Sequence, residues 1–321
     1  MRFHVIMGKT IGELLSLKRT ITIVAVGLAA GVGLYFLMWQ RLFESGDMSL
    51  EMQTSSLIGY FLIISFMFLA GIYLAYIIGL AGLEFVAKEE ERGTLLLMVS
   101  KPVSRFQFLL GKFLALLLTS LLLELIVLLG SVLLLGKLLE LDPDILEALL
   151  GLVPWTLLFS VIVGLLFAAI SIAASALIKS DTIRSLLLMV VIMLIFGIGP
   201  MLRTVSPNAY ESYHLYYVDG SYNLGNAYEL LLNQAESGRM TPQIQALSGM
   251  FTGGYKTGAT ELILTMFLGS SESFDPDIGA MLPSLEQTEY LNPVVSILLS
   301  LAIAAAALGV AKVAMERKEV F

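Results

Sequence analysis

The amino-acid sequence predicts an all-α polytopic membrane protein with six transmembrane helices. Hydrophobic residues make up 57% of the 321-residue chain and charged residues only 14%, whereas soluble domains carry about 25% charged residues. A soluble fold of this length could not bury so much apolar surface, so lipid must be part of its solvent. The hydrophobic residues also form long uncharged runs that charged residues separate.

Six of these runs are long enough to cross a bilayer, which takes about 20 helical residues. The predicted spans lie within residues 21–39, 57–80, 108–135, 148–178, 185–202 and 292–311. Residues 1–20 come before the first span and carry mixed charge, which predicts an amphipathic helix on the membrane surface and not a secretory signal. In the fifth span, Gly199 and Pro200 are expected to end or kink the helix.

Small residues recur at four-residue spacing within the predicted spans, for example Gly27 with Gly31, and Gly71 with Ala75 and Gly79. Such residues let helix backbones approach closely. We expect them to serve packing within one chain, and a seam between two chains is the alternative.

The distribution of basic residues predicts the orientation. Segments 1–20, 84–112, 179–184 and 312–321 hold 14 of the 19 basic residues, whereas 17 of the 26 acidic residues lie in segments on the opposite side. Basic residues concentrate on the cytoplasmic side of a membrane. We therefore expect a multi-pass protein of the cell (cytoplasmic) membrane with both termini in the cytoplasm.

The predicted domains are 1–20, the surface segment; 21–202, the first five helices; 203–291, an outer loop; and 292–321, the last helix and its tail. The outer loop is rich in Tyr, Gly, Asn and Ser and is longer than a connector needs. We expect a small cap with short helices over 228–234 and 261–268, which could dock an extracytoplasmic partner. A floppy insertion is the alternative.

Composition excludes several classes of function. A net charge of −7 argues against nucleic acid as a partner. The absence of cysteine excludes disulfides, thiolate metal sites and a cysteine nucleophile. His4 and His214 fall on opposite sides of the membrane in this topology, so no metal site and no catalytic residue are expected.

The run Gly8-Lys9-Thr10 is similar to part of a phosphate-binding loop. The full pattern requires a glycine five residues before Gly8, and Phe3 stands there. The chain itself is therefore not expected to bind ATP.

The most informative segment is 84–112, which reads EFVAKEEERGTLLLMVSKPVSRFQFLLGK. It begins as a charged helix in which Glu84 and Lys88 form an i,i+4 pair. Gly93 interrupts this helix, and an apolar patch follows at 95–98. The pattern predicts a short amphipathic helix at the inner membrane surface that offers apolar and ionic contacts to a cytoplasmic partner.

A second helix is predicted to start near Ser104, after a turn that Pro102 fixes. Arg105 and Lys112 are two turns apart on one face of it.

This segment resembles the ABC type-2 (ABC-2) permease family, particularly the branch similar to the permease of the nitrous-oxide-reductase maturation system. That branch carries a pattern like E-x-x-G-T-L-x-x-L-L-S-x-P-V-S-R-x-x-x-L-x-G-K after its second helix. The matching residues are Glu90, Gly93, Thr94, Leu95, Ser100, Pro102, Val103, Ser104, Arg105, Leu109, Gly111 and Lys112. Met98 and Val99 stand where the family commonly has leucines.

The resemblance implies a permease subunit of an ATP-binding-cassette transporter, most consistent with export, and not an enzyme. Two permease chains, identical or different, would pair, and two ATPase subunits would dock on them and bind ATP and Mg. Within the coupling loop 84–106, residues 84–98 would form the coupling helix. The residues expected to couple are Glu84, Lys88, Glu90, Glu91, Arg92, Gly93, Thr94, Leu95, Pro102, Arg105 and Lys112.

Glu124 lies near the middle of the third predicted span. An ionisable group at that depth is costly and is a candidate for a substrate path or a proton relay. Packing of a protonated or hydrogen-bonded carboxyl against Ser or Thr of a neighbouring helix is the other interpretation. The alternative function, an ion- or proton-coupled secondary transporter, would use Glu124, although such proteins normally show inverted repeats and several buried polar or charged groups.

Overall fold

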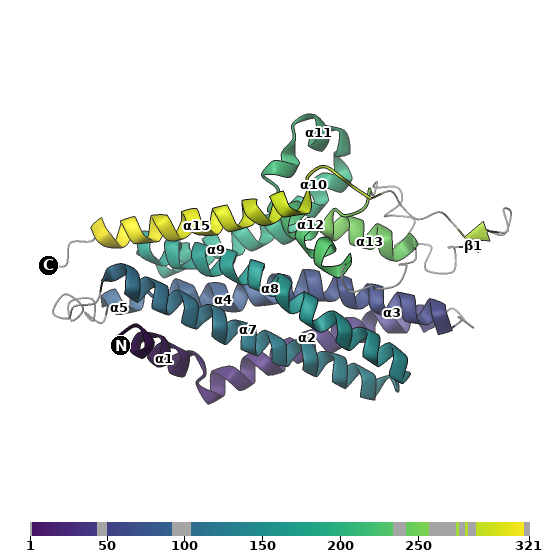
Figure 1. Ribbon diagram of the computed structural model, residues 1–321, viewed down its shortest axis with the longest axis horizontal. Helices are drawn as coiled ribbons and strands as arrows, with labels where there is room; N and C mark the ends of the chain where they lie inside the picture. Colours follow the sequence, from purple (N-terminus) through teal and green to yellow (C-terminus); the bar gives the residue numbers. More distant parts are fainter. Residues whose placement is uncertain are drawn as a thin grey trace.

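The computed structural model describes residues 2–43, 50–91, 104–233, 242–256, 274–275, 280–281 and 287–317. It is a bundle of long helices in which the two ends of the chain lie at the same end, on the left in Figure 1. We call this the terminal end and the opposite one the distal end. The described residues contain six helices that are long and apolar enough to span a membrane, as predicted. These are Leu17–Leu37, Leu57–Glu91, Arg105–Leu138, Pro143–Leu177, Asp181–Val205 and Pro293–Arg317.

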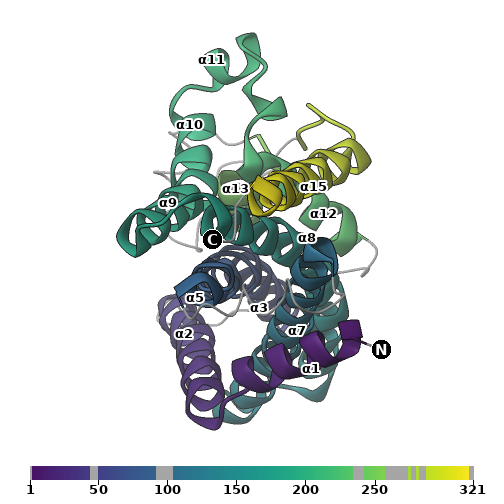
Figure 2. The same cartoon turned by 90° about the vertical axis from the view of Figure 1, so that its left-hand side faces the viewer.

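Helix α1 (Arg2–Leu14) lies across the terminal end of the bundle, as Figure 2 shows, and α2 (Leu17–Phe43) follows it as the first span. Thr10 and Leu14 of α1 are buried, whereas Lys9 and Glu13 form an exposed ion pair at 3.7 Å. One apolar face and one charged face are what a helix lying along a membrane surface requires.

The second span changes its helical geometry in the middle. It consists of α3 (Leu50–Ile64), the π-helical segment η1 (Ser65–Tyr73) and α4 (Leu74–Leu83). Gly71 permits the wider turn, because a Cβ there would lie 2.4 Å from the Phe66 carbonyl oxygen. The Tyr73 hydroxyl donates a 2.7 Å hydrogen bond to the Ile23 carbonyl of α2 and so joins the first two spans.

Helices α7 (Arg105–Leu138) and α8 (Pro143–Leu177) form the centre of the bundle. Ser104 starts α7 with a capping box, in which its hydroxyl accepts from the Gln107 amide and the Gln107 side chain accepts from the Ser104 amide. The predicted start near Ser104 is therefore confirmed. Asp142 caps α8, and Pro143 follows at its first position, where its missing N–H costs nothing.

The fifth span continues through the position at which Gly199 and Pro200 were expected to end it. It consists of α9 (Asp181–Met193), the π-helical segment η2 (Leu194–Ile198) and α10 (Gly199–Val205). The Gly199 amide bonds to the Leu194 carbonyl, five residues earlier, so a wide turn comes directly before the proline. Of the two expectations, a helix end was wrong because this turn accommodates the proline ring within a continuous helix, and a kink stays a prediction.

The chain between the fifth and sixth spans forms short elements at the distal end. They are α11 (Pro207–Ser212), the 3₁₀ turn η3 (Leu215–Tyr217), α12 (Gly220–Asn233) and α13 (Pro242–Thr252). Strands β1 (Phe274–Asp275) and β2 (Ala280–Met281) pair antiparallel, with Phe274 opposite Met281. The sixth span, α15 (Pro293–Arg317), then returns to the terminal end (Figure 1).

Helix α12 is longer and more buried than the sequence indicated. The predicted helix over 228–234 falls in it, but α12 begins at Gly220 and packs against α15 and α8. The Tyr228 hydroxyl donates to the Leu62 carbonyl at 2.9 Å and lies 2.6 Å from the Ser65 hydroxyl. This part of the outer segment is therefore anchored in the bundle. The predicted helix over 261–268 lies outside the described residues.

Some glycines of the spans, including Gly27 and Gly79, lie against side chains of other helices of the same chain. A Cβ on Gly27 would lie 2.5 Å from the Tyr73 hydroxyl, and one on Gly79 would lie 2.5 Å from the Leu188 side chain. A larger residue at either position would require the neighbouring side chain to move.

Candidate functional site

The first candidate site is the place at the terminal end where the chain leaves the second span. Helix α5 (Ala87–Glu91) begins there, and the hydroxyl oxygen of Ser175 on α8 accepts from the Val86 and Ala87 amides at 3.0 and 3.2 Å. The first amides of a helix have no partner within it. A side chain from another helix thus caps α5 and fixes it to the end of α8.

Lys112 ties α5 to the beginning of α7. Its Nζ lies 2.8 Å from Oε1 of Glu89 and donates to the Phe85 carbonyl at 3.1 Å. The same ammonium group stands over the rings of Phe85 and Phe108, at 5.1 and 4.9 Å from their centroids. Because Lys112 and Glu89 are both largely shielded from solvent, this pair is screened less than a surface pair.

Arg105 ties the beginning of α7 to the end of α15. Its Nη1 donates to the backbone carbonyls of Met315 and Glu316, at the C-terminal end of α15. A cation is favourable at this position because the last carbonyls of a helix carry partial negative charge. Four elements, α5, α7, α8 and α15, therefore meet in one terminal-end junction.

The remaining predicted coupling residues divide into two groups. Glu84, which precedes α5, pairs with Lys88 at 2.5 Å, as expected. Glu90 and Glu91 lie on α5 together with Lys88. The rest lie outside the described residues. These are Arg92, Gly93, Thr94, Leu95 and Pro102.

A groove of about 320 Å³ runs beside α5. Its lining includes Glu84, Lys88 and Glu91 from the segment that follows α4. Asp181 and Arg184, which pair with each other, line it from the beginning of α9. The groove thus brings the segment after the second span next to the connection between the fourth and fifth spans.

Sequence reasoning missed Ser175 and did not identify Glu89 as the partner of Lys112. Ser175 stands in a run of small residues near the end of a span, and its contact with α5 joins residues 89 positions apart. No local pattern marks such a contact. Glu89 was one of three consecutive acidic residues, among which spacing alone does not choose.

Glu124 is buried in the bundle with 1% of its surface exposed. Neither carboxyl oxygen has a hydrogen-bond partner within the described part of the chain. The hydrogen bond to Ser or Thr that the packing interpretation allowed is not present there, and the packing of a protonated carboxyl stays open. The unsatisfied carboxyl in a membrane interior keeps Glu124 a candidate for a substrate path.

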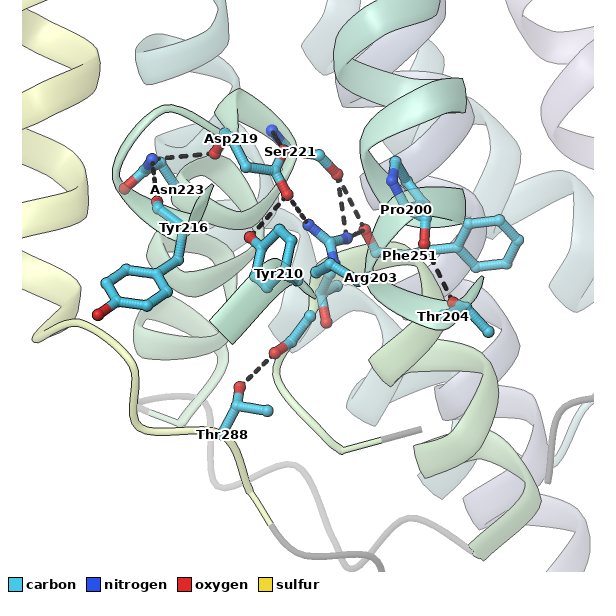
Figure 3. A network of polar contacts seen from close by, with 12 residues as sticks. Pro200, Arg203, Thr204, Tyr210, Tyr216, Asp219, Ser221, Asn223, Phe251 and Thr288 are labelled. Carbon is cyan, nitrogen blue, oxygen red and sulfur yellow. Dashed lines mark hydrogen bonds and ion pairs between the residues drawn. The ribbon is translucent and has the colours of Figure 1, made fainter. Parts of the chain in front are cut away.

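The second candidate site is a polar network at the distal end, shown in Figure 3. Arg203 of α10, 8% exposed, pairs through Nη1 with Oδ2 of Asp219 at 2.6 Å. Its Nη2 donates to the Ser221 hydroxyl at 3.2 Å and to the Phe251 carbonyl at 2.9 Å. The guanidinium group thereby joins α10, α12 and α13.

Two further residues close this network. The Tyr210 hydroxyl of α11 donates to Oδ2 of Asp219 at 2.9 Å (Figure 3), and burial together with the charge of Asp219 raises the pKa of Tyr210. Gly253 has a φ of +79°, and a Cβ there would lie 3.1 Å from Nε of Arg203, so glycine is required beside the guanidinium.

A pocket of about 210 Å³ adjoins this network. Arg203, Tyr210 and Glu211 line one side, and residues 287–290 before α15 contribute Thr288 and Tyr290. The Tyr290 hydroxyl donates to Oε1 of Glu211 at 2.6 Å. Across the described residues, no cluster of three or more His, Cys, Asp or Glu side chains could hold a metal ion.

A scan against protein-family models matches the ABC-2 family transporter protein model over residues 35–320. The comparison with curated proteins gave no match. The matched region contains both candidate sites and extends from the end of the first span to the end of the sixth. Members of this family are membrane components of ABC transporters and work with an ABC ATPase subunit. The chain belongs to the ABC-2 family of transporter proteins, as a membrane permease subunit.

Proposed function

We propose that this permease transmits the ATP-driven closure of two separate ATPase subunits to its membrane helices and so moves a substrate, in the direction of export. ATP and Mg bind on the ATPase subunits. The terminal end faces the cytoplasm in the cell membrane, and a second permease chain, identical or different, completes the pair. The motif of residues 90–112 supports the branch similar to the permease of the nitrous-oxide-reductase maturation system.

The terminal-end junction is the observation that carries this proposal. Helix α5 is capped by Ser175 of α8 and paired with Lys112 of α7, while Arg105 of α7 reaches the end of α15. An ATPase that pushes on α5 therefore acts on three spans besides the one that α5 follows. Packed helices respond to such a push by moving as rigid bodies.

Acidic residues at the exposed end of α5 supply the test. Glu91 is exposed and follows Glu90 on α5. The tagged protein would be purified in mild detergent from its host, as wild type and as Glu91→Lys. Glu289→Lys, an equal charge reversal at an exposed residue of the distal end, is the matched control.

We expect an ATPase subunit to copurify with the wild type and with Glu289→Lys, and to be lost or reduced with Glu91→Lys. If the ATPase binds all three proteins equally, α5 is not the docking element. If no ATPase copurifies with any of them, the proposed coupling itself is wrong.

A further inference from the structure

The distal end carries a projection that the permease function does not use. Residues 206–219, which include α11 and η3, extend sideways from the bundle in both Figure 1 and Figure 2, at a large angle to the long helices. We call them the lateral arm. The arm follows directly on Val205, where the fifth span ends. Tyr290, three residues before the sixth span begins, stacks on the arm residue Tyr216 with ring centroids 5.3 Å apart. The arm therefore leaves the bundle at the level where two spans end.

The exposed surface of the lateral arm combines large aromatic and apolar side chains with the polar residues Ser206, Asn208, Glu211, Ser212 and His214. Tyr213 is 76% exposed, Tyr217 53% and Val218 81%. Both acidic groups of the arm have partners, although Glu211 is exposed. Asp219 is paired with the buried Arg203, and Glu211 accepts from Tyr290. Large aromatic and apolar side chains exposed beside polar ones suit a boundary between apolar and aqueous surroundings.

The apolar strip continues from the arm onto the spans. Val205, at the end of α10, is 69% exposed, and Leu298 on α15 is 59% exposed. Side chains of the spans with this exposure face lipid. The exposed residues of the arm lie where this apolar surface of the spans ends.

We propose that the lateral arm lies in the headgroup layer of the bilayer, with Tyr213, Tyr217 and Val218 in contact with phospholipid. Tyrosine is enriched at this boundary because its ring enters the apolar region while its hydroxyl stays hydrated. The partner of this surface is the lipid interface. Under the proposed orientation it belongs to the outer leaflet.

Internal contacts hold the arm in this direction. The Tyr210 hydroxyl bonds to Asp219, and the Asn223 side chain donates to the carbonyls of Tyr216 and Asp219 at 3.1 and 2.9 Å. His214, at the tip, has a φ of +52° and lies 2.7 Å from the Tyr216 hydroxyl through its Nδ1. These contacts fix the backbone of the arm, so Tyr213 and Tyr217 stay exposed without a partner protein to order them.

Site-directed spin labelling tests the proposal directly, because the chain contains no cysteine. Tyr213→Cys and Val218→Cys, each labelled with a nitroxide, would be reconstituted into phosphatidylcholine vesicles. Collision of the nitroxide with oxygen, which concentrates in lipid, is compared with collision with a water-soluble nickel complex. Leu298→Cys is the control for a lipid-facing side chain, and Glu289→Cys for a water-facing one.

We expect both arm positions to resemble Leu298→Cys, with oxygen accessibility exceeding nickel accessibility. Nickel accessibility equal to that of Glu289→Cys would place the arm in water and overturn the proposal. Shielding from both reagents would also overturn it, because another protein surface, such as a second copy of the chain, would then cover the arm. The measurement needs no ATPase, so its outcome is independent of the coupling test.

Discussion

Many polar residues that this protein buries are joined into pairs and networks, whereas Glu124, Thr119 and Ser131 have no hydrogen-bond partner among the described residues. Arg203 and Asp219 are each 8% exposed and lie 2.6 Å apart. Such a pair adds little net stability over an apolar pair, but removal of one partner leaves a buried charge uncompensated. The loss of stability on removing one partner therefore depends on whether the other partner is left as a buried, uncompensated charge.

Asp219→Asn is expected to destabilise the distal end by about 3–5 kcal/mol, because it keeps the side-chain shape and removes the charge that compensates Arg203. Thermal unfolding in detergent measures the loss. Lys9→Ala, which breaks the exposed pair of Lys9 with Glu13, serves as the control and should change stability by about 0–1 kcal/mol. Equal shifts for the two variants would contradict a buried pair at Arg203.

Glu229 on α12 makes stability depend on pH. Burial raises the pKa of its carboxyl above 4.5, and hydrogen bonds from Ser248 and Thr252 lower it in part. An acid whose pKa is higher in the folded state favours folding below its unfolded pKa, and this contribution is lost as pH rises through the folded pKa.

Glu229→Gln should therefore flatten the decline of the unfolding temperature that the wild type shows as pH rises above 4.5. The amide keeps an oxygen that accepts from both hydroxyls, but it cannot ionise. Unfolding temperatures of the two proteins over a pH series give the comparison. Parallel curves would show that Glu229 does not carry the dependence.

Glu124 is expected to be retained for function at the expense of stability. Glu124→Met removes a buried carboxyl that has no hydrogen-bond partner in the described structure, and we expect a gain of about 1–3 kcal/mol in stability. Transport or ATPase activity of the reconstituted complex should fall if the carboxyl lies in the substrate path. A more stable variant with unchanged activity would exclude that role.

At the scale of elements, helix α5 is held by other helices more than by its own length. Five residues cannot form a stable helix in isolation. Ser175 supplies the cap, Lys112 supplies the ionic contact to Glu89, and both lie on long helices of the bundle. The position of α5 therefore follows the positions of α7 and α8.

Ser175→Ala should uncouple this element while leaving the bundle folded. Two amides at the beginning of α5 lose their acceptor. A cost of about 1.4 kcal/mol lowers tenfold the equilibrium constant that favours α5 in its position against α8. The readout is the ATPase activity of the complex. Ser171→Ala is the matched control one turn earlier, because the Ser171 hydroxyl bonds only to Ala168 of its own helix among the contacts described. Equal activity of the two variants would contradict the capping role.

At the scale of the whole molecule, the two candidate sites lie at opposite ends of the bundle and are joined through its centre. Tyr228 of α12 contacts the π-helical segment η1 at Ser65, and its ring packs on Phe66 and Phe159 at 5.1 and 4.9 Å. The same span then continues through α4 to the terminal-end junction. A movement of the second span would therefore shift both α12, near the distal network, and α5, at the terminal-end junction.

Labelling of single cysteines should establish which end faces the cytoplasm. With a membrane-impermeant maleimide on intact cells, Glu289→Cys at the distal end is expected to react, and Glu13→Cys at the terminal end to react only after permeabilisation. Both side chains are exposed, so reactivity reports sidedness. The reverse pattern would invert the orientation that the basic residues predict.

Local and periodic features could be predicted from the sequence. The six spans depend on runs of apolar residues, the start of α7 on Ser104, and the pair of Glu84 with Lys88 on helical spacing. Each of these is decided by neighbours within about two turns of helix. The motif at 90–112 indicated the family for the same reason, since its residues are consecutive.

The sequence by itself thus determined that the chain is a six-span membrane protein of the ABC-2 family. Tertiary structure alone decided that Ser175 caps a helix 88 residues before it, that α12 enters the bundle, and that Arg203 organises the distal end. These contacts join residues that are far apart in the chain. Their formation depends on the relative placement of whole helices, which the packing of the folded bundle fixes and local patterns do not encode.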